Sequence, residues 1–142
     1  MSYKLTITPK PEYLHAIVTG LNSPENVRSY IEEIQRACKA RRCSRVLVEE
    51  RLEGPRLGTV DLFQITVEEC SRAQGFFKAV AYVGVNAAGD LMEFAETVAV
   101  NRGVPMRMFA TVDDAERWLR GDDGGGAPQN APADAGGRSG GR

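Results

Sequence analysis

A strand-like segment is followed by a helix-like segment four times along this chain, and this alternation restricts its fold more than any other feature. The strand-like segments are short and rich in branched apolar residues, whereas the helix-like segments repeat apolar residues at steps of three and four. Strands that alternate with helices predict an α/β domain in which a mostly parallel sheet is built through right-handed crossovers.

The N-terminal region adds one antiparallel strand. Residues 4–8 alternate between polar and apolar side chains, which predicts a half-buried strand, and residues 13–19 predict a second, more buried one. Pro9 and Pro11 favour a turn between them, and so short a link joins antiparallel strands as a hairpin. The expected order is ββαβαβαβα, with five strands in one sheet and a single domain over residues 1–120.

The first helix has the clearest start. Ser23 is positioned to cap free amides, Pro24 suits the first helical position, and Glu25 places a negative charge near the positive end of the helix dipole. The expected buried face of this helix consists of Val27, Tyr30, Ile31, Ile34 and Cys38.

Three further strand–helix pairs follow, with strands expected at residues 45–50, 77–85 and 104–109. The first contains a continuous apolar run, residues 46–48, which is typical of a strand covered on both faces, although so short a run also allows a buried helical segment. Pro105 predicts that the last strand lies at an edge, because proline donates no ladder hydrogen bond. The expected buried faces of the three helices are Val60, Phe63, Val67 and Cys70; Leu91, Phe94, Ala95 and Val98; and Ala115, Trp118 and Leu119.

The composition changes at Gly121. The last 22 residues contain eight of the 15 glycines, two prolines and no aromatic or branched aliphatic side chain. Such a segment buries too little apolar surface to offset the entropy that it would lose on ordering. We therefore expect residues 121–142 to form a disordered tail.

Composition excludes several classes of protein. The formal net charge is -1, with 42% hydrophobic and 26% charged residues, which is typical of a globular domain and lacks the basic excess of nucleic-acid-binding proteins. No apolar run reaches the roughly 18–20 residues that cross a bilayer, and the N-terminus lacks the pattern of a signal peptide. We expect a cytoplasmic protein that neither binds nucleic acid nor inserts into a membrane.

The cysteines do not have the spacing of a metal site. Cys38, Cys43 and Cys70 form no CxxC pair, and His15 is the only histidine. A structural zinc ion needs four such ligands at characteristic spacings, so we expect no metal and no cofactor. The three cysteines are expected to be reduced thiols, with Cys38 and Cys70 buried on helix faces.

Several stretches together resemble one bacterial family. They are the hairpin followed by Ser23-Pro24-Glu25-Asn26, the strand Arg45-Val46-Leu47-Val48-Glu49, and the ending Asn101-Arg102-Gly103-Val104-Pro105-Met106-Arg107-Met108-Phe109 with Asp113-Asp114-Ala115-Glu116-Arg117-Trp118-Leu119. Over residues 3–120 the chain resembles the bacterial STAS-like proteins, which are related to the anti-sigma-factor antagonists. This resemblance implies a regulatory role and a strand–helix superhelix that is also related to the CRAL-TRIO lipid-transfer fold.

The chain departs from the antagonists at their regulatory site. In those proteins, a serine within an Asp-Ser-Ser-Gly-like motif at the start of the second helix is phosphorylated by a partner kinase, which switches binding to the anti-sigma factor. The corresponding residues 53–61 read EGPRLGTVD, so the motif is absent and the loop is longer. Thr59 is the one hydroxyl in this stretch; it is the candidate phosphoacceptor, and it also fits an ordinary N-cap.

Two functions are open at this point, and the first is a non-enzymatic module that binds another protein. Its docking surface would lie where the parallel strands end and the second helix begins. The residues expected there are Glu50, Arg51, Glu53, Arg56, Gly58, Thr59, Asp61, Asn86 and Asp90. The same charges would also suit a solvated loop without a partner.

The second function is a domain that binds a small apolar or lipid-like ligand, as the CRAL-TRIO relationship implies. Its pocket would be lined by Phe63, Phe76, Phe77, Met92 and Phe94, residue types that also serve simply as core. An enzyme is not expected. His15 has no acidic residue beside it in the sequence, and Glu49 and Glu50 would point to opposite faces of one strand.

Overall fold

The computed structural model describes residues 3–73, 75–84 and 90–121, apart from the side chains of residues 90–92 and 94. The nine elements are β1 (Tyr3–Pro9), β2 (Leu14–Leu21), α1 (Pro24–Ala40), β3 (Arg45–Glu53), α2 (Thr59–Ala73), β4 (Ala79–Gly84), α3 (Asp90–Asn101), β5 (Met106–Phe109) and α4 (Val112–Leu119). This order confirms the ββαβαβαβα prediction.

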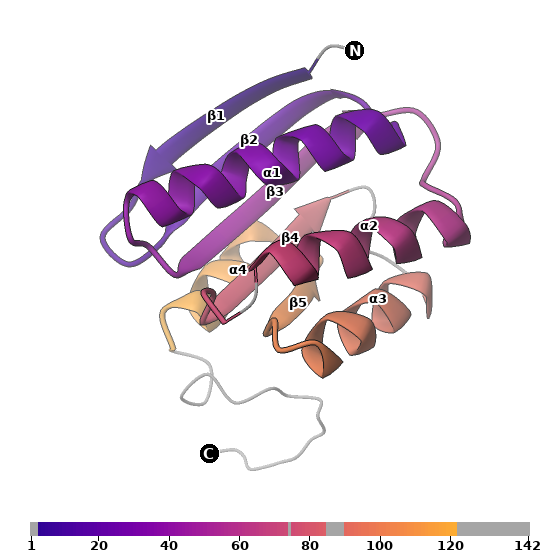
Figure 1. The fold of residues 1–142 in the computed structure, drawn as a ribbon. Coiled ribbons are helices and arrows are strands. Elements are labelled where there is room, and N and C mark those ends of the chain that lie inside the picture. The colour runs from indigo at the N-terminus through magenta and orange to yellow at the C-terminus, as the bar shows by residue number, and fades with distance from the viewer. Residues whose placement is uncertain (1–2, 74, 85–89, 122–142) are drawn as a thin grey trace.

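The five strands form one sheet in the order β1-β2-β3-β4-β5 (Figure 1). β1 pairs antiparallel with β2, which confirms the hairpin, and every other pair is parallel. β3 lies at the centre of the sheet, so that Val48 is opposite Ala16 on one side and Tyr82 on the other. Its apolar run is therefore a strand, and the helical alternative is wrong.

The helices cover the two faces of the sheet unequally. α1, α2 and α3 lie together over one face, while α4 lies alone behind β3, β4 and β5 (Figure 1). The larger core cluster lies under the three helices and includes Val18, Tyr30 and Val48. The smaller cluster lies under α4, where Leu47 and Ala81 meet Trp118. The opposite face of β1 and β2 has no covering helix among the described residues.

Two helix starts follow the local sequence signals. The Ser23 hydroxyl accepts a hydrogen bond from the Asn26 backbone amide at 3.2 Å, and Pro24 occupies the first position of α1. At the start of α4, the Thr111 hydroxyl accepts a hydrogen bond from the Asp114 backbone amide at 3.2 Å. The expected stripe of α1 faces the core, with Ile31 partly buried, and the expected face of α4 is buried.

The predicted buried face of α2 is wrong for Val60 and Phe63, whereas Cys70 is buried and Val67 is half-buried. Val60 is 67% exposed and Phe63 is 40% exposed. The residues that this helix buries are Leu62, Ile65, Thr66, Glu69, Cys70 and Ala73. Two polar residues interrupt the true apolar face, and Thr66 is accommodated there because its hydroxyl donates to the Leu62 carbonyl at 2.7 Å. A prediction based on apolar residues alone therefore identified a neighbouring face of α2 instead of the buried one.

Several strand boundaries also differ from the predictions. β3 continues to Glu53 rather than residue 50, because the backbone from Arg51 onward still pairs with β2 although Arg51 and Glu53 are polar and exposed. β4 and β5 are shorter than expected, at Ala79–Gly84 and Met106–Phe109. The link between β3 and α2 is consequently only the five-residue segment Gly54–Gly58, here called the β3–α2 loop.

β5 is an edge strand, as Pro105 predicts. The Glu96 side chain on α3 reaches this edge, where one carboxylate oxygen accepts the Met108 amide at 2.6 Å. Burial raises the pKa of Glu96, and the hydrogen bond from Met108 opposes that rise. The Glu96 carboxylate therefore accepts the hydrogen bond of a backbone amide on β5 that could otherwise pair with a strand of another molecule.

Some predictions fall outside the described residues. These are the tail from residue 122 onward, Asn86, and the side chains of Leu91 and Phe94 that were expected on the buried face of α3; Ala95 of that face is buried. Within the part of the chain that is described, no helix is both long and apolar enough to cross a membrane.

Gly84 provides a test of the strand packing. Its φ is +150°, and a Cβ at this position would lie 2.4 Å from the Glu50 carbonyl oxygen on the paired strand. We expect Gly84→Ala to lower the free energy of unfolding by about 3 kcal/mol, since backbone strain and steric overlap each cost about 1–3 kcal/mol. Urea unfolding followed by circular dichroism measures this change.

Gly75→Ala is the matched control, because Gly75 also has a positive φ of 73° but no atom within 4 Å of the place that a Cβ would take. It should lose only about 1–2 kcal/mol, the cost of the left-handed conformation. Equal losses in the two variants would contradict the close approach of β3 and β4.

Candidate functional site

The carboxyl edge of the parallel sheet is built around the β3–α2 loop. Asn22, which is buried after the end of β2, donates its backbone amide to the Glu53 carbonyl at 2.8 Å and its side-chain amide to the Pro55 carbonyl at 2.9 Å. Asn26 donates its side-chain amide to the Leu21 carbonyl at 2.9 Å. Asn22 therefore anchors the loop and Asn26 anchors the end of β2. Sequence reasoning missed both contacts because the partners lie on other elements.

Most of the predicted docking residues lie at this edge. Arg51, Glu53, Arg56 and Gly58 are exposed, and Asp61 is half-buried in the first turn of α2. Arg51 and Glu53 belong to β3 itself rather than to a loop. Asp90 is the first residue of α3, whereas Asn86 lies outside the described residues.

Glu50 is not on the docking surface. It is only 6% exposed and faces the three helices, where its carboxylate accepts a hydrogen bond from the Tyr30 hydroxyl. Burial and the adjacent Glu50 charge raise the pKa of Tyr30 well above its ordinary value. The prediction placed Glu50 at the end of the strand and on the docking surface, but β3 extends past it to Glu53 and the alternation of the strand turns Glu50 inward.

Thr59 is exposed and is the first residue of α2, but it is not the N-cap. The Gly58 carbonyl accepts a hydrogen bond from the Leu62 backbone amide at 3.0 Å. This is the first hydrogen bond of the helix, which makes Gly58 the N-cap residue. The interpretation of Thr59 as an N-cap is therefore wrong. Its hydroxyl lies at the positive end of the helix dipole, where added negative charge is favourable.

Exposed apolar side chains gather at the same edge. The described residues include four large hydrophobic side chains that are clearly exposed, and three of them, Leu21, Val60 and Phe63, belong to the end of β2 and the start of α2. The fourth, Val100, lies near the other end of the helical layer, at the end of α3. The carboxyl edge therefore combines apolar side chains with charges of both signs.

His15 has an acidic partner that its sequence neighbours do not reveal. Its Nε2 atom lies 2.9 Å from an oxygen of Glu49, whose other oxygen accepts a hydrogen bond from Arg51 Nε at 2.8 Å. Burial would raise the pKa of Glu49, but the hydrogen bonds from Arg51 and His15 outweigh it and lower the pKa. Glu49 and Glu50 point to opposite faces of β3, as predicted, so this cluster is separate from the buried Glu50.

A cavity of about 90 Å³ lies between the helical layer and the sheet. Its walls come from α1, α2, α3 and β3–β5, and Leu57 of the β3–α2 loop also lines it. Of the side chains predicted to line a pocket, Phe77 does so, Phe76 packs edge-to-face on Phe77 at 5.0 Å between ring centroids, and Phe63 is exposed instead. The side chains of Met92 and Phe94 lie outside the described part of the chain.

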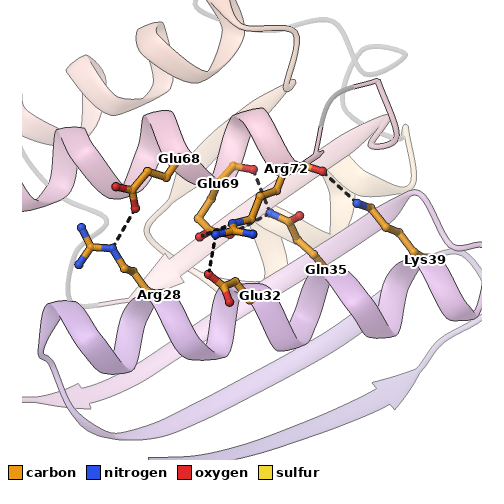
Figure 2. A network of polar contacts seen from close by, with 7 residues as sticks. All are labelled: Arg28, Glu32, Gln35, Lys39, Glu68, Glu69 and Arg72. Atoms are coloured by element: carbon orange, nitrogen blue, oxygen red, sulfur yellow. Dashed lines mark hydrogen bonds and ion pairs between the residues drawn. The ribbon is translucent and has the colours of Figure 1, made fainter.

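Polar contacts join α1 to α2 beside this cavity (Figure 2). Arg28 Nε donates to a Glu68 oxygen at 2.9 Å, and Lys39 Nζ donates to the Arg72 carbonyl at 2.9 Å. Between these two contacts, Gln35 Nε2 donates to the Glu69 carbonyl at 3.0 Å.

Glu69 lies at the centre of this network but is only 5% exposed. Arg72 approaches it from the solvent side and lies 3.5 Å from both Glu69 and Glu32 (Figure 2). Burial, together with the negative charge of Glu32, raises the pKa of Glu69 to about 7 despite Arg72. Structural networks of charged groups also shift pKa values in this way, so the shift by itself does not mark a binding site.

The cysteines are free thiols. Cys38 and Cys70 are buried, as predicted, and burial raises the pKa of Cys38 to about 12. Cys43 is half-buried and lies 3.3 Å from the Arg45 carbonyl oxygen. Within the described ranges, no group of three or more His, Cys, Asp or Glu side chains is arranged to hold a metal ion.

Comparison with solved structures identifies the fold. An uncharacterized protein of the DUF3478 family from Shewanella loihica, described as having a SpoIIAA-like fold, matches this chain with a TM-score of 0.50. The match covers 82% of this chain and 93% of that one at 22% sequence identity. This chain has a SpoIIAA-like fold. No protein-family model and no curated protein sequence matches it.

The SpoIIAA-like fold confirms the STAS-like architecture that the sequence resemblance implied. The identity of 22% shows a shared fold and carries no residue role from one protein to the other. Any role of the carboxyl edge or of the cavity must therefore be argued from this chain's own side chains.

The raised pKa of Glu69 predicts a specific dependence of stability on pH. Between the ordinary glutamate pKa of 4.5 and about 7, the folded protein keeps a proton that the unfolded chain has lost, so stability falls as pH rises. We expect the free energy of unfolding to drop by about 1–3 kcal/mol across this window, and Glu69→Gln to reduce this decrease, leaving the contribution of Glu96, whose pKa is also raised. Urea titrations at several pH values measure it.

The exposed Glu93 of α3 offers a control, since Glu93→Gln should keep the slope of the unaltered protein. If Glu69→Gln showed that same slope, the carboxyl group of Glu69 would not be the one that titrates.

Proposed function

We propose that this chain is a non-enzymatic regulatory module that binds another protein through the carboxyl edge of its sheet. The observation that carries the proposal is the grouping of Leu21, Val60 and Phe63, which make up three of the four exposed large hydrophobic side chains of the described residues. Exposed apolar side chains that gather with a charged rim are typical of protein interfaces. The SpoIIAA-like fold supports a role in regulation only by analogy.

The charges around these apolar side chains would orient the partner. Arg51, Glu53 and Arg56 place both signs at the edge within six positions of the chain. Rim charges of this kind mainly affect the association rate and its salt dependence, whereas buried apolar contacts set the dissociation rate. The partner's surface should therefore be apolar at its centre with charges of both signs around it.

Thr59 would be the regulated position if the module is controlled by phosphorylation. It is exposed beside Val60, and a phosphate there would add close to two negative charges at the centre of the docking edge. We expect this module to act in the cytoplasm and without catalysis. Glu49 and Glu50 lie on opposite faces of β3, so they do not form a paired acid and base.

The double variant Val60→Ser/Phe63→Ser tests the docking edge. We expect it to weaken partner binding by about tenfold or more, because truncating each of the two interface side chains would remove about 1 kcal/mol of binding free energy. The full chain, tagged and used as bait in its own host, would be compared with the variant by quantitative mass spectrometry of co-purified proteins.

Val100→Ser is the matched control, because Val100 is 56% exposed on α3 but lies away from the carboxyl edge. A partner lost from the double variant and kept by Val100→Ser supports the proposal. A set of co-purified proteins that is the same for all three baits would overturn it.

A further inference from the structure

Two of the three free thiols lie at the carboxyl end of α1, where the helix ends in a hydrogen-bonded turn. The Cys43 backbone amide donates to the Cys38 carbonyl at 2.9 Å, and the Arg42 backbone amide donates to the Lys39 carbonyl at 3.1 Å. Arg42 has a φ of 55°. Two such hydrogen bonds around a left-handed residue define a Schellman motif, in which Arg42 takes the position that glycine usually occupies.

The motif brings the side chains of Cys38 and Cys43 together, because they occupy the two positions whose side chains commonly contact each other across the turn. Cys38 is a fully buried member of the larger core cluster, and Cys43 packs against that cluster. The two thiols are close enough for charge on Cys43 to raise the pKa of Cys38. A disulfide requires Cα atoms about 4.4–6.8 Å apart, and the direct backbone hydrogen bond keeps those of Cys38 and Cys43 close to one another.

Contacts with neighbouring elements hold this turn in place. Lys39, between the two cysteines, donates its Nζ to the Arg72 carbonyl at 2.9 Å and ties the last turn of α1 to the end of α2 (Figure 2). Cys43 Sγ lies 3.3 Å from the Arg45 carbonyl oxygen at the start of β3. A thiol is a weak donor, so the loss of that contact on oxidation costs little. Little conformational entropy remains to be lost when a bond forms between the two sulfurs.

The two cysteines differ in their access to solvent. Cys43 is half-buried in the link between α1 and β3 and follows the exposed residues Arg41 and Arg42, whereas Cys38 is fully buried. Cationic side chains beside a cysteine attract an oxidant that carries negative charge. Cys43 is therefore the thiol that an oxidant meets first, and Cys38 is positioned to react with it afterwards.

We propose that Cys38 and Cys43 form a redox-active dithiol, which a low-molecular-weight disulfide converts into an intramolecular disulfide at the end of α1. In cytosolic proteins such bonds are usually transient and serve to sense the redox state. The dithiol precedes the amino end of β3, whereas the docking edge lies at its carboxyl end (Figure 1). Failure of either proposal therefore leaves the other intact.

The reaction consists of two thiol–disulfide exchanges. The Cys43 thiolate attacks one sulfur of the oxidant, whose S–S bond breaks, and one half of the oxidant leaves as a thiolate that takes up a proton. The Cys38 thiolate then attacks the Cys43 sulfur and releases the other half in the same way. Two protein thiols are oxidised, and one small disulfide is reduced to two thiols. Because burial raises the pKa of Cys38 to about 12, the second exchange should be slow and should accelerate as pH rises.

The test equilibrates the full-length protein with mixtures of reduced and oxidised glutathione, in the folded state and in urea. The effective concentration of the dithiol is the ratio of the squared concentration of reduced glutathione to that of oxidised glutathione when half of the protein is oxidised. We expect it to be about tenfold higher or more in the folded protein, because only folding holds the two thiols in the turn.

Mass spectrometry after alkylation of the remaining thiols locates the bond. Trypsin cleaves after Lys39, Arg41 and Arg42, so a disulfide between Cys38 and Cys43 appears as a link between two separate peptides. Gel electrophoresis without a reducing agent distinguishes this bond from one that joins two chains.

Three variants separate the roles of the cysteines. In the folded protein, Cys43→Ser should prevent both disulfide formation and glutathione addition, since the two remaining thiols are buried. Cys38→Ala should instead trap glutathione on Cys43. Cys70→Ala is the matched control, because Cys70 is a buried thiol on α2 and its loss should leave the bond unchanged. If Cys38→Ala does not fold because Cys38 belongs to the core, the other two variants carry the test.

The proposal would be overturned by any of four results. These are an effective concentration that is no higher in the folded protein than in urea, glutathione addition without formation of the internal bond, a disulfide that includes Cys70 or joins two chains, and a bond that survives Cys43→Ser. A bond that maps to Cys38 and Cys43, is favoured by folding and is retained by Cys70→Ala would support it.

Discussion

The rest of the structure depends on the position of β3, which pairs with a parallel strand on each side and is covered on both faces along its first half. This arrangement requires the apolar run Val46–Val48. Past Val48 the cover on the α4 side ends, so Glu49 and Arg51 turn to the open face while Glu50 and Leu52 stay under the helices. One strand thus supplies part of the core, a buried acid and a polar edge.

The elements whose signals are local could be predicted from the sequence. The order of strands and helices, the hairpin and the cap at Ser23 follow from residues that are close together in the chain. The buried face of α2 could not be predicted in the same way, because Thr66 and Glu69 belong to it and both are polar. Their burial depends on a hydrogen bond within the helix and on contacts with α1, which a search for apolar periodicity does not detect.

The candidate site was partly predictable for the same reason. The location of the carboxyl edge follows from the topology of a parallel sheet, and most of the residues predicted for a docking surface lie there. The pair of His15 and Glu49 depends on the register of two strands, and the burial of Glu50 and Glu69 depends on which way their side chains turn. Register and side-chain direction arise only when the layers pack, so sequence neighbours do not reveal them.

The two edge strands of the sheet, β1 and β5, differ in whether a side chain bonds to the backbone at the edge. At β5 the Glu96 carboxylate occupies the Met108 amide, whereas β1 forms the other edge of the sheet. Strand-to-strand association between copies of the chain would therefore be directed to β1. Pairing of β1 with its own counterpart is two-fold symmetric and uses up both free edges, so it closes at a dimer. Continuous growth into a fibre needs two edge strands on each molecule that can pair with a neighbour. The Glu96 carboxylate disfavours such pairing at β5, because it already accepts the hydrogen bond of the Met108 amide.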